Sequence, residues 1–484
     1  MTEPTMMTLL RGVETTPLRA GDTPVTGIAY RSDAVQPGFA FFCIRGFAHD
    51  GHDFAQDAID RGASALVVER ELPHLDVPQF LVPESRIALA LAAAEFYGHP
   101  SRAMQLAGIT GTNGKTTTTY LLDSIMRAAG RITGIVGTVE TRVAGERLPA
   151  SRTTPESSDL EALLARMLEA GVSSAALEVS SHAIDLHRVD GLRFAVVAFT
   201  NLTQDHLDYH TTLEEYFMVK RRLFMDFDVA ARVINIDDPV GRSLAEEVEA
   251  PITVSQDSSA TVRAQDVALA ADGSRFELVV GGETASVRLP LAGAYNVSNA
   301  LVAAGCALAC GVDLATIVRG LELAPQVPGR LERVDCGGAF SVIVDYAHTP
   351  DSLEKAIVAV KAVTPGRVVV VFGCGGDRDL EKRPLMGTVA GLNADFTIVT
   401  SDNPRSEDPV GIILQIEDGL RITDATWEVE IDRGRAIARA ISLARPGDAV
   451  LIAGKGHEDY QIFADRRVHF DDREVARREL ETQC

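Results

Sequence analysis

Short apolar segments, each followed directly by a polar or glycine-rich cluster, recur along most of this chain. The clearest instances are QLAGIT before GTNGK, SAALEV before SSHA, FAVVAF before TNLTQDH, SVIV before DYAHTP, RVVVVF before GCGGDRD, FTIVT before SDNPR and AVLIA before GKGHED. Alternation of apolar strands with helical segments is typical of parallel sheets covered by helices. Because open parallel sheets bind ligands at the carboxyl ends of their strands, the polar clusters predict a site assembled there.

The length of 484 residues is enough for about three domains. The segment GHPSRAM, residues 98–104, is typical of a linker, and a second break falls in QVPGRLERV, residues 326–334. The sequence therefore predicts an α/β protein of three domains. These are a small N-terminal α/β module over residues 1–99, a central parallel-sheet domain of the P-loop ATPase type over 100–331, and a Rossmann-like C-terminal domain over 332–484.

Composition and charge limit the class of protein. Apolar residues make up 46% of the chain and charged residues 24%, which is the balance of a soluble globular protein. The net charge of -22 repels nucleic acid and anionic membranes, so no nucleic-acid partner is expected. The longest apolar stretch, from Ile87, is too short for a membrane span, and the first residues lack the pattern of a signal peptide.

The cysteines are scattered and show no paired spacing of the kind that binds metal. They are Cys43, Cys306, Cys310, Cys336, Cys374 and Cys484. This pattern fits reduced thiols in the cytoplasm, which is the expected location. Cys306 and Cys310 lie one helical turn apart and are expected to be small core residues. We expect the protein to be a monomer.

The segment ITGTNGKTTTTYLL, from Ile109, places a glycine-rich turn between an apolar strand and a helix. Gly111 and Gly114 permit the backbone angles that turn successive N–H groups toward an anion. Lys115 adds charge for the outer phosphates, and the Thr116 hydroxyl can ligate Mg²⁺. Ile109 stands where the strict phosphate-loop pattern has its first glycine. The expected nucleotide-binding residues are Gly111, Thr112, Asn113, Gly114, Lys115, Thr116 and Thr117.

Two polar residues at strand ends are candidates to complete a metal site. Glu178 ends the strand SAALEV, from which a carboxylate can reach an ion held by Thr116. His206 follows FAVVAF, but a lone histidine is more often structural, so its position leaves both roles open. Lys220, in EYFMVKRRLF, has on composition alone the character of an exposed helix lysine.

Together these motifs resemble those of the Mur ligases, the ATP-dependent amide-forming enzymes of peptidoglycan assembly, over nearly the whole chain. The motifs that carry the resemblance are GITGTNGKTTT, EVSSHA, NLTQDHLDYH, GAYNVSNAL, PGRLERV and VDYAHTPDSL. Two C-terminal motifs, DNPR and GKGHEDYQ, are similar to the branch that adds meso-diaminopimelate to UDP-N-acetylmuramoyl-L-alanyl-D-glutamate (UDP-MurNAc-L-Ala-D-Glu). Several long motifs in the same order make this a specific signal.

The resemblance implies ATP and two Mg²⁺ ions. Lys220 matches the lysine that is carbamylated in the family, so the resemblance reverses the interpretation from composition and makes Lys220 (as N6-carboxylysine) a metal ligand. The metal ligands implied are Thr116, Glu178, His206 and Lys220. The catalytic residues implied are Lys115, Glu178, His206 and Lys220.

Other binding residues also follow from matching positions. Those near ATP are Asn296, Asn299, Arg330 and Asp345. Those for the nucleotide-peptide substrate are Ser32, in the N-terminal uridine-nucleotide module, and Thr153, Thr154, Ser180 and Arg188. The chain departs from the family where Arg31-Ser32-Asp33 replaces the commoner Asp-Ser-Arg, and where Leu186 replaces a glutamine found in some members. Substrate contacts at both places are expected to differ.

The DNPR segment bears on the choice of amino acid. Diaminopimelate differs from lysine by a second carboxylate, and the guanidinium of Arg405 can grip a carboxylate with two parallel hydrogen bonds. Arg378 matches a second arginine of the family's amino-acid pocket, and Glu458 with the Gly454 carbonyl is suited to the distal ammonium. The alternative is a surface turn with a solvated arginine. The expected pocket residues are Arg378, Asp402, Asn403, Pro404, Arg405, Gly454 and Glu458.

The reaction implied is γ-phosphoryl transfer from ATP to the D-glutamate side-chain carboxylate, followed by attack of the diaminopimelate amine on the acyl phosphate. Closure of the C-terminal domain is expected to exclude water. A ligase that uses L-lysine or ornithine remains open. A folylpolyglutamate synthase-like ligase is disfavoured by the Ser32 module and DNPR, and a GTP switch by the lack of an Asn-Lys-x-Asp segment.

Overall fold

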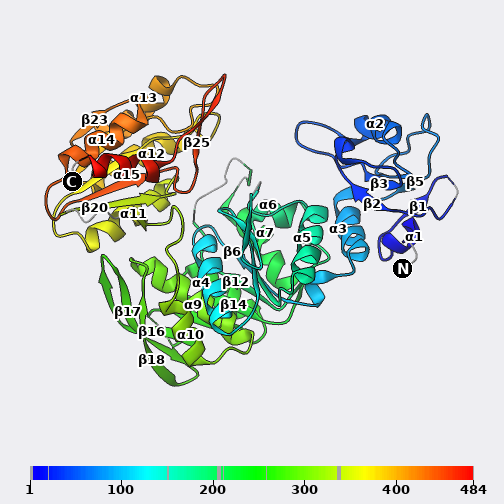
Figure 1. Cartoon of the computed structure of the whole chain (residues 1–484), viewed down its shortest axis with the longest axis horizontal. Coiled ribbons are helices and arrows are strands. Elements are labelled where there is room, and N and C mark those ends of the chain that lie inside the picture. Colours follow the sequence, from blue (N-terminus) through cyan, green and yellow to red (C-terminus); the bar gives the residue numbers. More distant parts are fainter. Residues whose placement is uncertain are drawn as a thin grey trace.

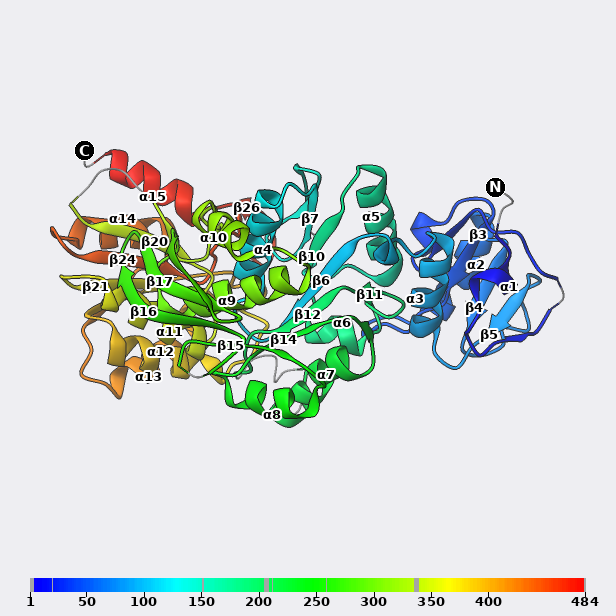
Figure 2. The same cartoon turned by 90° about the horizontal axis from the view of Figure 1, so that it is seen from below.

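The protein consists of three α/β parts arranged one after another, with the N-terminal part at one end of the molecule and the C-terminal part at the other (Figures 1 and 2). Each part contains its own sheet. The computed structural model describes residues 4–19, 21–149, 152–203, 209–210, 212–257, 259–334 and 339–482. In the described part of the chain, every helix is too short or too polar to cross a bilayer.

The N-terminal part is built on a five-stranded sheet that is parallel except at one edge. The strands, in spatial order, are β1 (Thr16–Pro17), β5 (Gln79–Leu81), β4 (Ala65–Val68), β3 (Phe39–Phe42) and β2 (Gly27–Ala29). Its helices are α1 (Met6–Leu9), α2 (Ala55–Asp60) and α3 (Ser85–Phe96). The apolar stretch IALALAAAEF lies within α3, and most of that helix is buried.

The central part is built on an eleven-stranded sheet whose middle is parallel. The strands, in spatial order, are β18 (Glu283–Leu289), β17 (Gly273–Val280), β16 (Val262–Ala270), β15 (Ile252–Ser255), β14 (Arg232–Asn235), β12 (Val196–Phe199), β6 (Gln105–Thr110), β10 (Ser174–Glu178), β7 (Thr133–Val136), β8 (Thr141–Val143) and β9 (Glu146–Leu148). The sequence located β6, β10 and β12. The antiparallel strands β17, β18, β8 and β9 add to the sheet at its two edges and were not anticipated.

Helices cover both faces of the central sheet because side chains alternate between the faces along each strand. Ile109 of β6 and Ala198 of β12 pack on one side with helices α4 (Lys115–Ala128), α9 (Ala294–Ala309) and α10 (Leu314–Glu322). Leu106 and Val197 pack on the other side. The helices there are α5 (Ser157–Glu169), α6 (Ser181–Asp185), α7 (Leu213–Met225) and α8 (Pro239–Glu247). Cys306 of α9 and Cys310, which directly follows this helix, are core residues, as predicted.

The C-terminal part has a six-stranded sheet in which only the edge strand β19 is antiparallel. The strands, in spatial order, are β19 (Glu332–Arg333), β20 (Ser341–Asp345), β24 (Ala449–Ala453), β21 (Val368–Phe372), β22 (Phe396–Val399) and β23 (Trp427–Val429). The helices are α11 (Pro350–Ala362), α12 (Lys382–Asn393) and α13 (Pro409–Arg421) on one face and α14 (Arg433–Leu443) and α15 (Asp472–Glu481) on the other. A separate hairpin joins β25 (Tyr460–Ile462) to β26 (Arg467–His469).

The strand VVVVF of β21 is buried along its whole length, as expected for a strand covered on both faces. The sequence also located β20, β22 and β24 correctly. Polar segments that follow β20, β21, β22 and β24 lie on the side of the sheet that meets the central part. The strand-end pattern in the sequence therefore corresponds to one shared region between the two larger sheets.

Candidate functional site

The glycine turn after β6 has the geometry of a phosphate loop. Gly111 has a φ of +146° and Gly114 a φ of +88°, and helix α4 begins at Lys115 directly after the turn. A Cβ atom on Gly114 would lie 2.3 Å from Asn299 Oδ1, so neither the backbone angle nor the space admits a larger residue. Lys115 Nζ donates to the carbonyls of Gly111 and Thr112, both at 2.8 Å, and so lies over the loop.

Glu178, at the end of β10, joins the phosphate loop to the neighbouring strand end. Its carboxylate is buried, with 1% of the residue exposed. Thr116 Oγ1 donates to Glu178 Oε2 at 3.1 Å, and Thr138 donates to both carboxylate oxygens through its backbone N–H (2.9 Å) and hydroxyl (3.0 Å). A carboxylate and a hydroxyl held together beside a phosphate loop are the oxygen ligands that Mg²⁺ prefers.

Lys220, on α7, lies close to the phosphate loop and to Glu178. The residue is 1% exposed, its Nζ donates to the Gly111 carbonyl at 3.1 Å, and it lies 4.4 Å from the centroid of the Tyr216 ring. The interpretation from composition, an exposed helix lysine, is therefore wrong. Lys220, Thr116 and Glu178 line one cavity of about 170 Å³ beside the loop.

Only some of the predicted metal ligands lie within the described residues. His206 lies outside the described residues. Within the described ranges, no three His, Cys, Asp or Glu side chains gather as a metal site would require. The predicted ligands do not depend on such a triad, because two of them are Thr116 and Lys220. Thr116, Glu178 and Lys220 are the members that the structure brings together.

The residues matched to the nucleotide-peptide substrate form a chain of hydrogen bonds beside Glu178. Thr154 Oγ1 donates to the Glu178 carbonyl at 2.8 Å and accepts from the Ser180 backbone N–H at 3.2 Å. Arg188 donates to the Thr154 carbonyl at 3.2 Å. Thr153 Oγ1 lies 3.0 Å from Thr138 Oγ1, which places it at the wall of the loop cavity.

Ser32 lies apart from these residues, at the start of a short 3₁₀ turn (Ser32–Ala34) in the N-terminal part. The exchanged charges at Arg31 and Asp33 pair with each other, at 3.0 Å between Arg31 Nε and Asp33 Oδ1. Tyr30 Oη donates to Asp159 Oδ2 of α5 at 2.8 Å, so the segment before Ser32 contacts the central part.

Of the four residues matched to ATP, Asn299 and Arg330 contact the loop and the start of α4, whereas Asn296 contacts Asn299 and Asp345 contacts Leu331. Asn299 Nδ2 donates to Asn296 Oδ1 at 3.1 Å, and Asn299 packs against Gly114. Arg330 donates to Thr116 Oγ1 at 3.3 Å. Asp345, at the end of β20, accepts from the Leu331 backbone N–H at 2.6 Å, and burial raises the pKa of its carboxyl group.

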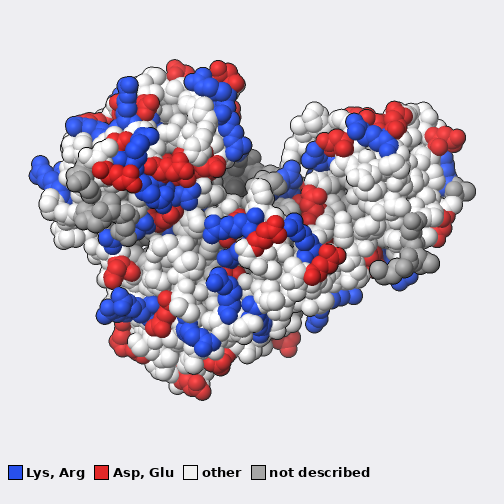
Figure 3. All heavy atoms as spheres, viewed as in Figure 1, with Lys and Arg blue, Asp and Glu red and all other residues white. Residues whose placement is uncertain are grey.

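A second, larger cavity of about 1160 Å³ opens between the central and C-terminal sheets. On the face shown in Figure 3, basic and acidic side chains are interspersed, and the surface is hollowed between the C-terminal and N-terminal lobes. Among the residues predicted for the amino-acid pocket, those that line the cavity are Arg378, Asp402, Asn403, Arg405, Gly454 and Glu458. Pro404 connects two of them without lining the cavity itself.

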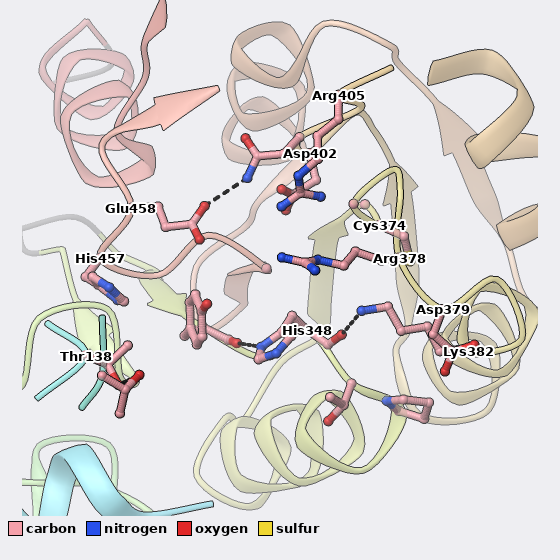
Figure 4. A pocket seen from close by; sticks show the side chains of 18 of the residues that line it. Thr138, His348, Cys374, Arg378, Asp379, Lys382, Asp402, Arg405, His457 and Glu458 are labelled. Atoms are coloured by element: carbon pink, nitrogen blue, oxygen red, sulfur yellow. Dashed lines mark hydrogen bonds between the residues drawn. The ribbon is translucent and has the colours of Figure 1, made fainter. Parts of the chain in front are cut away.

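The backbone of the DNPR segment is fastened to the hairpin that follows GKGHED. Arg405 has a φ of +53°, its backbone N–H donates to the Ile462 carbonyl at 3.0 Å, and its guanidinium donates to the Gly376 carbonyl at 2.6 Å. Asn403 Nδ2 donates to Glu458 Oε2 at 2.9 Å, the contact drawn in Figure 4. Arg378, which points into the middle of the cavity in Figure 4, has no hydrogen-bond partner among the described residues. The guanidinium groups of Arg378 and Arg405 therefore line the same cavity as the carboxylates of Asp402 and Glu458.

Four residues line both cavities and mark where the two meet. They are Thr138, Thr153, Tyr346 and His348. His457 lines the larger cavity nearby, and burial, together with Arg330 and Arg473, lowers the pKa of its imidazole to about 3. The imidazole is therefore neutral at physiological pH. A group activated beside the phosphate loop and a nucleophile bound in the larger cavity can meet at this junction.

Several residues of the site were not found from the sequence. Thr138 follows β7 and His348 follows β20, so both obey the strand-end rule; the pattern marked the segment DYAHTP without singling out His348 within it. Lys382 lines the larger cavity and donates to the His348 carbonyl at 3.1 Å. It sits at the start of α12, where its sequence context gave no signal.

A parallel strand, a glycine turn, Gly-Lys-Thr and a helix, with a buried carboxylate at the next strand end, define a phosphate-loop nucleotide-binding protein of the α/β class. Three family models match the chain in order: "Mur ligase family, catalytic domain" over residues 24–97, "Mur ligase middle domain" over 109–307 and "Mur ligase, glutamate ligase domain" over 329–456. The chain belongs to the Mur ligase family, and it is an ATP-dependent ligase.

Individual relatives agree over almost the full length. The UDP-N-acetylmuramoyl-L-alanyl-D-glutamate--2,6-diaminopimelate ligase of Geobacillus thermodenitrificans is 46% identical over 95% of both chains. The protein of the same name from Solibacter usitatus is 46% identical over 95% of this chain and 94% of its own. A solved structure of a ligase with this name is 31% identical, with a TM-score of 0.71 over 100% of this chain and 99% of that one.

The turn at Gly114 yields a prediction on nucleotide binding. We expect Gly114→Ala to weaken ATP binding at least about tenfold, because the new Cβ would collide with Asn299 Oδ1 and the φ of +88° is strained for alanine. The measurement is ATP affinity by calorimetry.

Gly130→Ala is the matched control. Gly130 also has a positive φ, of +77°, but no atom lies within 4 Å of its added Cβ. This variant should lose stability of the order of 1 kcal/mol while its ATP affinity stays within about twofold. Equal ATP affinities for the two variants would contradict the role of the turn.

Proposed function

We propose that the protein joins meso-diaminopimelate to the D-glutamate side-chain carboxylate of UDP-MurNAc-L-Ala-D-Glu, with ATP converted to ADP and phosphate. The names of the relatives at 44–47% identity support this reaction. The structural observation that carries it is the junction of the phosphate-loop cavity with the larger cavity, at Thr138, Thr153, Tyr346 and His348. An acyl phosphate formed on one side would meet its nucleophile on the other.

The first step needs positioning and charge neutralisation, because ATP and the substrate carboxylate are both anions. We assign the outer phosphates to Lys115 and to backbone N–H groups of the glycine turn other than those of Thr112 and Asn113, which donate to Asn201. Thr153, Thr154, Ser180 and Arg188 are the residues that we assign to the dipeptide end of the substrate. Their hydrogen bonds to one another and to Thr138 support this assignment, because these residues lie side by side with the phosphate loop.

Mg²⁺ is the proposed metal, with two ions held by Thr116, Glu178, His206 and a carbamylated Lys220. When bound, the ions would neutralise charge on the transferring phosphoryl group. The buried position of Lys220 supports this assignment, because a carbamate there turns a cation at the Gly111 carbonyl into an anion that can ligate metal. Thr138 holds the Glu178 carboxylate in place through two hydrogen bonds.

Amine capture takes place in the larger cavity. Arg405 and Arg378 are assigned to the distal carboxylate of diaminopimelate, and Glu458 with the Gly454 carbonyl to the distal ammonium. L-Lysine and ornithine lack the distal carboxylate and would leave both guanidinium groups without an anion, which costs binding energy. The names of the relatives do not favour these acceptors, nor a folylpolyglutamate synthase-like reaction.

The remaining assignments concern the whole chain. We assign Ser32 and the N-terminal module to the uridine nucleotide, Asn296, Asn299, Arg330 and Asp345 to ATP, and the domains to residues 1–99, 100–331 and 332–484. We also propose that the protein works as a monomer in the cytoplasm. Sedimentation at the mass of one chain, 51.8 kDa, would support the monomer, and a dimer mass would exclude it.

Phosphate release tests the reaction itself. With UDP-MurNAc-L-Ala-D-Glu present, meso-diaminopimelate should give ATP-dependent phosphate release and a tripeptide product seen by mass spectrometry. L-Lysine, ornithine and glutamate should give at most about one hundredth of that rate at equal concentration, because each lacks part of the expected recognition. ATP hydrolysis without a tripeptide for any acceptor would exclude the proposed function.

Arg405→Ala tests the acceptor pocket. We expect the KM for diaminopimelate to rise about 100-fold, equivalent to about 2.7 kcal/mol, while the KM for ATP changes less than about threefold. The control is Arg421→Ala, an arginine of α13 whose side chain is 50% exposed and pairs only with neighbours on its own helix. Equal effects of Arg405→Ala on both KM values would contradict the assignment.

Lys220→Met tests the metal site. We expect kcat to fall about 1000-fold or more, because the carboxylate ligand is lost, while ATP affinity without Mg²⁺ changes little. Lys361→Met, at a half-exposed lysine of α11, is the control and should retain full activity. An active Lys220→Met enzyme with an unchanged Mg²⁺ requirement would remove Lys220 from the site.

A further inference from the structure

Lys455, in the GKGHED segment after β24, is a lysine without any exposed side-chain surface. Its Nζ donates to Asn403 Oδ1 at 3.2 Å and to Glu458 Oε2 at 3.3 Å, and it lies 3.8 Å from Asp402 Oδ1. It also lies 5.4 Å from the centroid of the Tyr460 ring. A buried ammonium is costly unless it is paired and hydrogen-bonded, so this cation is tied to the three polar side chains around it.

All three of these side chains line the larger cavity, whereas Lys455 itself does not. Lys455 therefore stands directly behind the wall that is assigned to the amino acid. Asp402 has a second buried cation at its other oxygen, because Arg433 Nη1 lies 4.0 Å from Asp402 Oδ2. Arg433 is bound mainly by Asp472, at 2.7 Å. Lys455 therefore differs from Arg433, because its hydrogen bonds go to two residues that line the cavity, Asn403 and Glu458.

The two oxygens of Glu458 are in different situations. Oε2 accepts from Asn403 Nδ2 at 2.9 Å and from Lys455 Nζ at 3.3 Å. Oε1 has no hydrogen-bond partner in the part of the chain that the structure describes. Asn403 is held in turn, because its Oδ1 accepts from Lys455 and from the Ile462 backbone N–H at 3.0 Å. The carboxylate is therefore fixed by one oxygen and open at the other.

We propose that Lys455 is a positioning residue for the acceptor: it holds Glu458 by Oε2 and Asn403 by Oδ1, so that Glu458 Oε1 is presented to an ammonium group of the amino-acid substrate. Because the Lys455 ammonium group is bound to Glu458 Oε2, an ammonium group of the substrate would bind at Glu458 Oε1. This inference rests on the assignment of Glu458 to the acceptor. It predicts a loss confined to acceptor binding, because the polar contacts of the Lys455 ammonium group among the described residues are with Asn403, Glu458 and Asp402.

The test compares Lys455→Met, Glu458→Gln and the double variant in the complete ligase reaction. Methionine keeps the length of the buried stem and removes only the ammonium. Lys455→Met should raise the KM for diaminopimelate about tenfold, with kcat and the KM for ATP within about threefold of the wild type. Lys455→Arg, which restores a cation, should recover most of the loss. Lys361→Met should show no change.

The double variant separates positioning from a general structural effect. If Lys455 acts through Glu458, adding Lys455→Met to Glu458→Gln should raise the acceptor KM by no more than about twofold, because residues in one network are not additive. A further tenfold rise would overturn the proposal, as would an unchanged acceptor KM in Lys455→Met. The double variant removes both charges, so it provides the comparison with Glu458→Gln even if Lys455→Met does not fold.

Glu458→Gln alone tests the assignment on which the inference rests. A KM for diaminopimelate unchanged by Glu458→Gln would overturn the role of Glu458 and with it the positioning role of Lys455. Tripeptide formation would persist in that case, so the proposed reaction would stand. Loss of the reaction with every acceptor in the wild-type protein would instead exclude the proposed function. Failure of the positioning role of Lys455 can therefore be distinguished from failure of the proposed function.

Discussion

The buried carboxylate of Glu178 is the contact on which the arrangement of the site depends. It accepts hydrogen bonds from Thr116 at the start of α4 and from Thr138 after β7, and so ties together three neighbouring strand ends of the central sheet. Thr116 also accepts from Arg330, at the entry to the C-terminal part. One carboxylate thereby fixes the phosphate loop relative to the segment that leads to the second sheet.

The wall of the larger cavity is arranged similarly, with buried cations in place of the buried carboxylate. Lys455 and Arg433 lie behind Asp402 and Glu458, while Arg378 and Arg405 face the cavity. Charges fixed in a low-dielectric wall need no reorganisation when a zwitterionic ligand arrives. Although the chain is strongly acidic, Lys115, Arg378 and Arg405 follow strand ends and line the two cavities, where each supplies a local positive charge.

Strand-end polarity located segments of the site from the sequence, but it did not single out every residue within them. It identified Glu178 and the segments that contain Arg378, Asp402 and Glu458, because an apolar strand followed by polar residues is a local pattern. Thr138 and His348, which line both cavities, obey the same rule. Lys220 could not be judged locally, since its burial depends on the packing of α7 against the glycine turn.

The sequence by itself determined the α/β class, the positions of the ligand-bearing strands and the glycine turn, because each depends on residues that are neighbours along the chain. Only the tertiary structure decided which strand ends are adjacent, that Lys220 and Lys455 are buried, and that the two cavities meet. These depend on contacts between residues far apart in the chain. An example is the hydrogen bond that Asn113 Nδ2 in the central part donates to Asp351 Oδ2 in the C-terminal part, at 3.0 Å. Such contacts leave no periodicity in the sequence, so packing alone specifies them.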